Sequence, residues 1–280
     1  MSHNSIISYE ELLRFYESAG VDDALSETPI NQFAQAMALQ ETTKPPFEVA
    51  PHSVKTPSKP AQSTPQQASR YKSAVPNDEQ VNVAKQLAQS ANTLDELRDV
   101  LMKFDGCSLK NTAKNTCFCD GKAGSPLMLI GEMPGRDEDL EGIPFVGRTG
   151  QLLNKMLKAI GLERQETYIA NIIPWRPPGN RAPTPLEIDI CQPFIDRQIE
   201  LAAPKIIIAF GGPVAQLLSG QKQGILRLRG HWKNYVTANG MTIPFMPTLH
   251  PTYLLHTPAQ KKYAWSDLLE VKMKLKTIVH

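Results

Sequence analysis

Short apolar runs alternate with segments of helical periodicity through the second half of the chain. Between the runs, leucine, isoleucine and methionine recur every three or four residues, as on the buried face of a helix. Runs this short and this apolar are typical of strands buried on both faces of a parallel sheet. We therefore predict an α/β fold of three layers, α/β/α, with a mostly parallel central sheet. The predicted strands are 127–130, 168–173, 205–210 and 243–249, and the predicted helices are 151–160, 185–203 and one that follows Gly211-Gly212-Pro213.

The pattern before the predicted globular domain, residues 79–280, is different. Ser8 and Glu11 have the spacing of a capping box ahead of an apolar face, which predicts a short helix within residues 1–25. Residues 26–78 are rich in Pro, Ser and Gln and have few large apolar side chains. Such a segment buries too little to offset the entropy of ordering it, so we predict a disordered linker. The helix would dock on another protein or on the chain's own globular domain.

Composition narrows the class of protein. Hydrophobic residues make up 41% of the chain, but no apolar stretch approaches the ~18 residues of a membrane span. The first residues have no basic segment followed by an apolar one, so we expect no signal peptide and a cytoplasmic protein. A net charge of +2 permits a nucleic-acid partner without demanding one. In a reducing compartment the four cysteines would be free thiols or metal ligands rather than disulfides.

The segment 131–150 follows the first predicted strand and has the composition of an active-site loop. It holds five glycines and two prolines, which let the backbone approach a ligand closely. Glu132, Asp137, Glu138 and Asp139 crowd carboxylates at the point where the strand ends. Because ligands of such sheets bind at the carboxyl ends of the strands, we favour a functional site over a solvated acidic turn.

Three further residues lie where their side chains could contact a ligand. Asn171 stands inside an apolar strand pattern, and its amide offers the donor and acceptor that would match O4 and N3–H of uracil; capping of nearby backbone is the alternative. Phe145 could present its ring to a base or simply fill the core. His250 directly follows a predicted strand, where it could donate to a developing oxyanion or be an ordinary loop histidine.

These residues together make the chain similar to the uracil-DNA glycosylase superfamily, closest to family 4 and to a related alphaproteobacterial branch. The similarity runs from about Phe104 to Leu275, and its motifs agree in order and spacing. The most specific parts are Gly131-Glu132-Met133-Pro134-Gly135, Glu138-Asp139, Pro144-Phe145-Val146-Gly147, Asn171, Arg176 to Arg181, Gly211 and His250-Pro251.

The resemblance implies hydrolysis of the N-glycosidic bond of a flipped-out deoxyuridine, with release of uracil from DNA during base excision repair. It implies that the uracil stacks on Phe145, is read by Asn171 and has its O2 held by His250. Glu138 would lie near C5 and help to exclude thymine, while Glu132 would orient or activate water. The loop after His250 resembles an intercalating loop, with Tyr253 or Leu254 as the wedge, and loop arginines are candidate phosphate contacts, namely Arg176, Arg181 and Arg229.

Two positions depart from the resemblance. Family 1 relatives have a water-activating aspartate where this chain has Met133, which lines the base pocket instead, so the general base is open. Family 4 enzymes hold a [4Fe–4S] cluster through four cysteines, and the matching positions here are Phe104, Cys107, Trp175 and Cys191. Half of the ligands are missing, so we expect no iron–sulfur cluster and no other cofactor, with Cys107 and Cys191 left as buried thiols. Cys117 and Cys119 keep a metal site as an alternative.

The expected partner is uracil-containing DNA, and we expect a monomer that does not contact a membrane. Two other functions stay open at this point. A catalytically silent nucleic-acid-binding module would bind a base in the same pocket without hydrolysis. A glycosylase for another deaminated base, such as hypoxanthine, would use the same residues with a different pocket wall at Met133.

Overall fold

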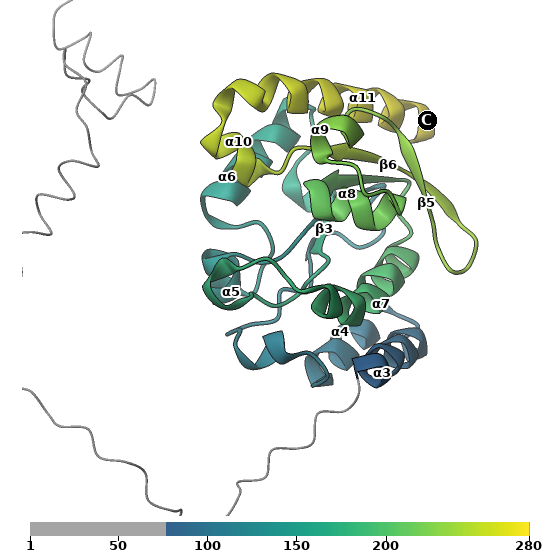
Figure 1. The fold of residues 1–280 in the computed structure, drawn as a ribbon. Helices are drawn as coiled ribbons and strands as arrows, with labels where there is room; N and C mark the ends of the chain where they lie inside the picture. Colours follow the sequence, from purple (N-terminus) through teal and green to yellow (C-terminus); the bar gives the residue numbers. More distant parts are fainter. Residues whose placement is uncertain (1–76, 280) are drawn as a thin grey trace, which may run out of the picture. The chain divides into compact units, whose positions relative to one another are not determined.

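The computed structural model describes residues 77–279, which form an α/β fold around a central sheet (Figure 1). The helix predicted within residues 1–25 and the linker predicted for 26–78 lie outside the described residues, except that 77 and 78 already belong to a helix, so the linker prediction is wrong at its last two residues. The sheet has six strands in the order β1-β3-β2-β4-β6-β5. Its strands are β1 Asp120–Gly121, β2 Leu127–Gly131, β3 Tyr168–Asn171, β4 Ile206–Phe210, β5 Lys233–Val236 and β6 Thr242–Thr248.

The four central strands run parallel, as the apolar runs predict. β2 pairs in parallel with β3 and β4, and β4 pairs in parallel with β6. The predicted strand 168–173 ends earlier, at Asn171, although Ile172 and Ile173 still donate backbone hydrogen bonds to Gly131 and Glu132 across the gap to β2. The sequence did not predict the edge strands β1 and β5, which both pair antiparallel.

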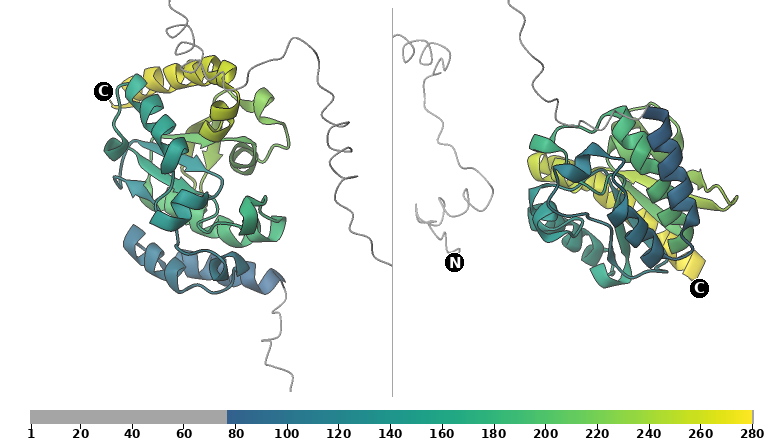
Figure 2. Two further views of the ribbon diagram at one scale, coloured as in Figure 1. Left: turned by 90° about the vertical axis from the view of Figure 1, so that its left-hand side faces the viewer. Right: turned by 90° about the horizontal axis from the view of Figure 1, so that it is seen from below.

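Helices cover both faces of the sheet, in the three layers that the sequence predicts (Figures 1 and 2). Side chains of β2 alternate between the two cores: Met128 and Ile130 pack with α3, α4, α7 and α8, while Leu127 and Leu129 pack with α6, α10 and α11. The helices are α3 Asn77–Ser90, α4 Leu94–Lys103, α5 Arg136–Glu141, α6 Gly147–Ala159, α7 Pro185–Ala202, α8 Gly212–Ser219, α9 Ile225–Leu228, α10 Pro251–His256 and α11 Lys261–Val279.

Local sequence signals explain where the main helices begin. Thr184 caps α7: its hydroxyl accepts the Glu187 amide while the Glu187 carboxylate accepts the Thr184 amide, a reciprocal pair that satisfies free amides of the first turn. α6 begins at Gly147, earlier than the predicted start at 151, so the end of the 131–150 loop is itself helical. Within residues 77–279, no helix is long and apolar enough to span a membrane.

Candidate active site

The carboxyl ends of the parallel strands bring Asn171 and Phe145 against one glycine. Gly131 at the end of β2 is in register with Asn171 at the end of β3. A Cβ atom on Gly131 would collide with Asn171 Oδ1 and would lie 2.6 Å from Phe145 Cζ. Glycine is therefore required here, because only a residue without a side chain lets the amide and the ring approach the strand end so closely.

Phe145 forms the apolar floor of this site. Its ring is stacked against the imidazole of His250, with centroids 5.5 Å apart and planes 30° apart. The Phe145 ring also contacts Phe210, the last residue of β4, with ring centroids 5.7 Å apart. Phe210 is not among the predicted site residues, although its place at the end of a predicted strand was a usable signal. The backbone of Phe145 has φ of 53°, a left-handed conformation that non-glycine residues rarely adopt.

His250 is the residue before α10 and is held through one ring nitrogen. Its Nδ1 accepts a hydrogen bond of 3.2 Å from the Thr252 amide. Nδ1 therefore carries no proton, and in the neutral ring the proton is on Nε2. Burial lowers the pKa of His250 to about 4, so the ring is neutral near pH 7. The side chain can thus offer one neutral Nε2–H donor.

The Asn171 side chain is 6% exposed and points its Oδ1 toward the strand end at Gly131. Among the residues that the structure describes, no group forms a hydrogen bond with this amide. The alternative from the sequence, an asparagine that caps nearby backbone, therefore has no support in its contacts. Its donor and acceptor are available to a ligand.

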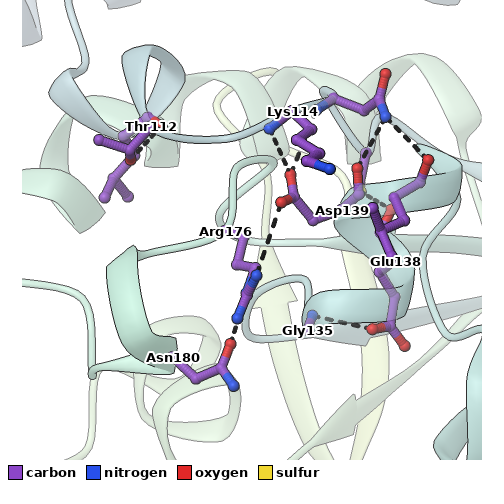
Figure 3. A network of polar contacts seen from close by, with 11 residues as sticks. Thr112, Lys114, Gly135, Glu138, Asp139, Arg176 and Asn180 are labelled. Atoms are coloured by element: carbon purple, nitrogen blue, oxygen red, sulfur yellow. Dashed lines mark hydrogen bonds and ion pairs between the residues drawn. The ribbon is translucent and has the colours of Figure 1, made fainter.

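The two glutamates of the loop differ in their surroundings. Burial raises the pKa of Glu132, which lies at the start of the loop and is half-buried. The Glu138 carboxylate accepts the Gly135 amide at 3.0 Å and the Val146 amide at 3.1 Å, and Figure 3 shows the bond to Gly135. Burial also raises the pKa of Glu138, and the two amides act in the opposite direction. Glu138 thus joins two segments of the loop, at Gly135 and Val146, while Met133 is half-buried and packs against the core that includes α7 residues.

A polar network fixes α5 to the neighbouring loops (Figure 3). The buried carboxylate of Asp139 accepts the backbone amides of Lys114 and Asn115 at 2.8 and 3.3 Å. Arg176 lies 3.9 Å from the same carboxylate and donates to Asn180 Oδ1 at 2.7 Å. Arg176, a predicted phosphate contact, is therefore oriented by two partners.

The other two predicted phosphate contacts are ion-paired within the fold. Arg181 forms two hydrogen bonds with Glu187, of 2.8 and 2.6 Å. Arg229 pairs with the buried Asp267 and donates to the Tyr263 carbonyl at 2.9 Å. Each of these arginines has a carboxylate partner that neutralises part of its charge.

The two predicted wedge residues differ sharply in exposure. Tyr253 is 41% exposed on α10, directly after the His250 turn. Leu254 is 1% exposed and belongs to the core that packs α6, α10 and α11 on the sheet. Of the two, only Tyr253 can reach a ligand without a change in the fold.

The four positions that match cluster ligands in the resemblance are all buried in one core, but they do not fit a [4Fe–4S] cluster. Cys107 and Cys191 share a hydrogen bond, which lowers the pKa of Cys107 and raises that of Cys191. Phe104 packs on Phe194 with ring centroids 5.1 Å apart, and Trp175 Nε1 donates to the Thr116 hydroxyl at 2.9 Å. The cluster needs four thiolates, and these four side chains include only two thiols.

The remaining cysteines do not complete such a site. The Cys117 thiol donates to the Glu138 carbonyl, and burial raises the Cys117 pKa to about 12, so it stays protonated. Cys119 accepts a hydrogen bond of 3.7 Å from Arg98. Over the described part of the chain, no three His, Cys, Asp or Glu side chains are grouped as metal ligands.

Comparison with known proteins identifies the family of this site. Residues 118–269, more than half of the chain, match the model of the uracil DNA glycosylase superfamily. The chain belongs to the uracil-DNA glycosylase superfamily. The resemblance read from the motifs is thereby confirmed, and so is the fold class.

Several proteins named as uracil-DNA glycosylases match about two thirds of the chain. The "Type-4 uracil-DNA glycosylase" of Archaeoglobus fulgidus is 35% identical over 184 residues, which are 64% of this chain and 92% of the relative. The protein of the same name from Saccharolobus solfataricus is 36% identical over 192 residues, 66% of this chain and 87% of the relative. That from Thermotoga maritima is 32% identical over 191 residues, 66% and 97% of the two chains.

Proposed function

We propose that this protein is a monofunctional uracil-DNA glycosylase. It would hydrolyse the N-glycosidic bond of a flipped-out deoxyuridine, leaving free uracil and an abasic site for base excision repair. Membership of the superfamily and the names of its relatives support the class of reaction. The observation that carries the proposal is that Asn171 and Phe145 meet at Gly131 while His250 stacks on the Phe145 ring.

Asn171 would read the base. Its amide nitrogen can donate to O4 of uracil while its oxygen accepts from N3–H. Cytosine presents a donor and an acceptor in the reversed order, so it would leave both groups unpaired in a nearly buried site, which costs ~1–3 kcal/mol for each unsatisfied group. Stacking on Phe145 would hold the base in the plane that this reading requires.

His250 would stabilise the leaving group. As the glycosidic bond breaks, negative charge develops on N1 and O2 of uracil, and the Nε2–H of a neutral His250 can donate to O2. One donor placed in advance for such charge contributes a factor of ~10² to 10³ in rate. The hydrogen bond from Thr252 fixes both the tautomer and the direction of the ring.

Glu132 would orient the attacking water. Its raised pKa favours acceptance of a proton, and Met133 supplies no carboxylate at the next position, where family 1 relatives have their aspartate. Glu138, which the resemblance places near C5 of the base, would exclude the thymine methyl by fixing the loop wall through Gly135 and Val146.

Tyr253 would be the wedge that fills the vacated stack, since its side chain is exposed beside the His250 turn. Arg176, Arg181 and Arg229 would position the backbone of DNA through the part of their surface that the internal partners leave open. The protein would act as a monomer in the cytoplasm, with its amino-terminal segment as a docking element.

Excision from labelled oligonucleotides tests this proposal. Substrates with one deoxyuridine, one deoxyinosine or only thymidine, each single- and double-stranded, are incubated with the protein and cleaved with alkali. We expect cleavage at uracil and none at thymine. Binding without cleavage of any substrate would instead support the silent binding module, and cleavage only at hypoxanthine would support the other deaminated base.

A further inference from the structure

The backbone of Phe145 is held in its unusual conformation from outside the loop. A left-handed φ of 53° at an aromatic residue is unfavourable by itself, so neighbouring groups must maintain it. Gly150 leaves room for this conformation, because a Cβ atom there would overlap the Phe145 carbonyl oxygen. Glu138 contributes through the Val146 amide, 3.1 Å from its carboxylate.

Arg164 supplies the most extensive set of contacts. It lies in the short turn η2, Arg164–Glu166, which precedes β3. Its Nη1 donates to the Phe145 carbonyl at 2.9 Å, and its Nη2 donates to the Pro144 carbonyl at 2.6 Å. The planar guanidinium therefore binds the two consecutive carbonyls on the amino-terminal side of Val146.

Other partners fix the guanidinium itself. Its Nε donates to Asp120 on the edge strand β1, and Nη1 also lies 3.2 Å from Asn154 Oδ1 on α6. The side chain is 16% exposed. A charged group with this many partners forms stronger hydrogen bonds than a neutral one, and arginine is suited to it because its donors have a fixed planar arrangement.

We propose that Arg164 is a positioning residue for uracil excision, which it would support by holding the Phe145 ring under the base. The inference rests on the proposed function only in naming uracil as the base that stacks there. Arg164 does not touch the pocket: it binds the carbonyl side of the Pro144–Phe145 turn, while the ring faces Gly131 and His250. Its effect on the reaction would therefore pass through Phe145.

The main test removes the guanidinium. Arg164→Gln should lower kcat/KM for uracil excision about 10- to 100-fold, because a displacement of about 1 Å in a positioned group has effects of this size. The inhibition constant of free uracil should rise with it, whereas affinity for uracil-free DNA should change less than about twofold, since phosphate contacts dominate that binding. Arg164→Lys keeps the charge and can reach one carbonyl, so its kcat/KM should lie between those of the wild type and Arg164→Gln.

A double-mutant cycle with Phe145→Leu locates the effect. If Arg164 acts through the ring, Arg164→Gln should cost less than about threefold when Phe145 is already leucine. The same loss in both backgrounds would overturn the proposal, as would wild-type kcat/KM in Arg164→Gln.

A matched control separates positioning from general stability. Arg197 on α7 donates twice to the Ala91 carbonyl, at 3.0 and 2.9 Å, and pairs with Glu200. None of these three residues belongs to the 131–150 loop. Arg197→Gln should leave kcat/KM and uracil inhibition unchanged at temperatures where it is folded. If it lowered them as much as Arg164→Gln does, the special role of Arg164 would be refuted.

Hydrogen exchange tests the contacts independently of activity. Arg164→Gln should speed amide exchange in a peptide that covers residues 143–150, which includes the Val146 amide, and Arg197→Gln should not. Unchanged exchange would overturn the inference even if the variant were less active. A wild-type protein that excises no base would contradict the proposed function, while this comparison would still decide whether Arg164 holds the loop.

Discussion

Replacement of Asn171 by alanine isolates the reading of the base. The change removes a donor and an acceptor from a site where the side chain is 6% exposed. The charge of the leaving uracil is delocalised onto O4, and loss of one donor placed for developing charge costs ~2.7–4 kcal/mol. Loss of the bond from N3–H adds ~0.5–1.5 kcal/mol. At ~1.4 kcal/mol per factor of ten, uracil excision should fall at least ~10²-fold.

The fold should tolerate this substitution. The described structure gives the Asn171 amide no hydrogen-bond partner of its own, so its removal breaks no internal contact of that kind. The free energy of unfolding should change by less than about 1 kcal/mol. Affinity for DNA should also change little, because backbone phosphates contribute most of it.

Single-turnover excision of uracil, urea unfolding and DNA binding are measured together for the wild type and the variant. Asn234→Ala is the control, an asparagine that is exposed on the edge strand β5, and it should behave as the wild type. Excision by Asn171→Ala within about threefold of the wild-type rate would refute the reasoning. So would a loss that merely follows a loss of folded protein.

Three further predictions follow from the site and the chain. Excision should decline as pH falls toward the raised pKa of the Glu132 carboxyl, since protonation removes the water-orienting group. Glu132→Gln should abolish this decline. Protonation of His250 should not contribute near the ordinary histidine pKa, because this ring stays neutral down to a pKa of about 4. The purified protein should be colourless, without absorption near ~400 nm when prepared without oxygen, because Phe104 and Trp175 stand at two ligand positions; stoichiometric iron and sulfide would contradict this. Deletion of residues 1–76, just before α3, should leave excision from short oligonucleotides nearly unchanged, and a loss above ~10-fold in folded protein would show that the segment takes part.

The strand ends explain why much of this site could be predicted. Asn171 and His250 lie far apart in sequence, but each follows or ends a continuous apolar run. Because parallel strands end at one edge, the alternation of strands and helices was enough to bring them together. Phe145 and Glu138 were predicted from the composition of the 131–150 loop and from the resemblance to the uracil-DNA glycosylase superfamily.

Other features depend on tertiary contacts that leave no local signal. β1 consists of two residues, and β5 alternates between half-buried and exposed positions, so neither resembles the buried runs of the core. Arg181 and Arg229 read as loop cations, yet Glu187 and Asp267 partner them in the fold. Arg164 is 19 residues from Phe145, and only the fold places its guanidinium on that carbonyl.

Mass spectrometric identification of the released base decides whether this protein excises uracil. The protein is incubated with a duplex that contains one deoxyuridine, and the solution is analysed for free bases over time alongside the Asn171→Ala variant. We expect uracil as the released base, in an amount equal to the abasic sites formed, with release slowed at least ~10²-fold in the variant. A protein that binds this duplex but releases no uracil, or that releases thymine as readily, would contradict it.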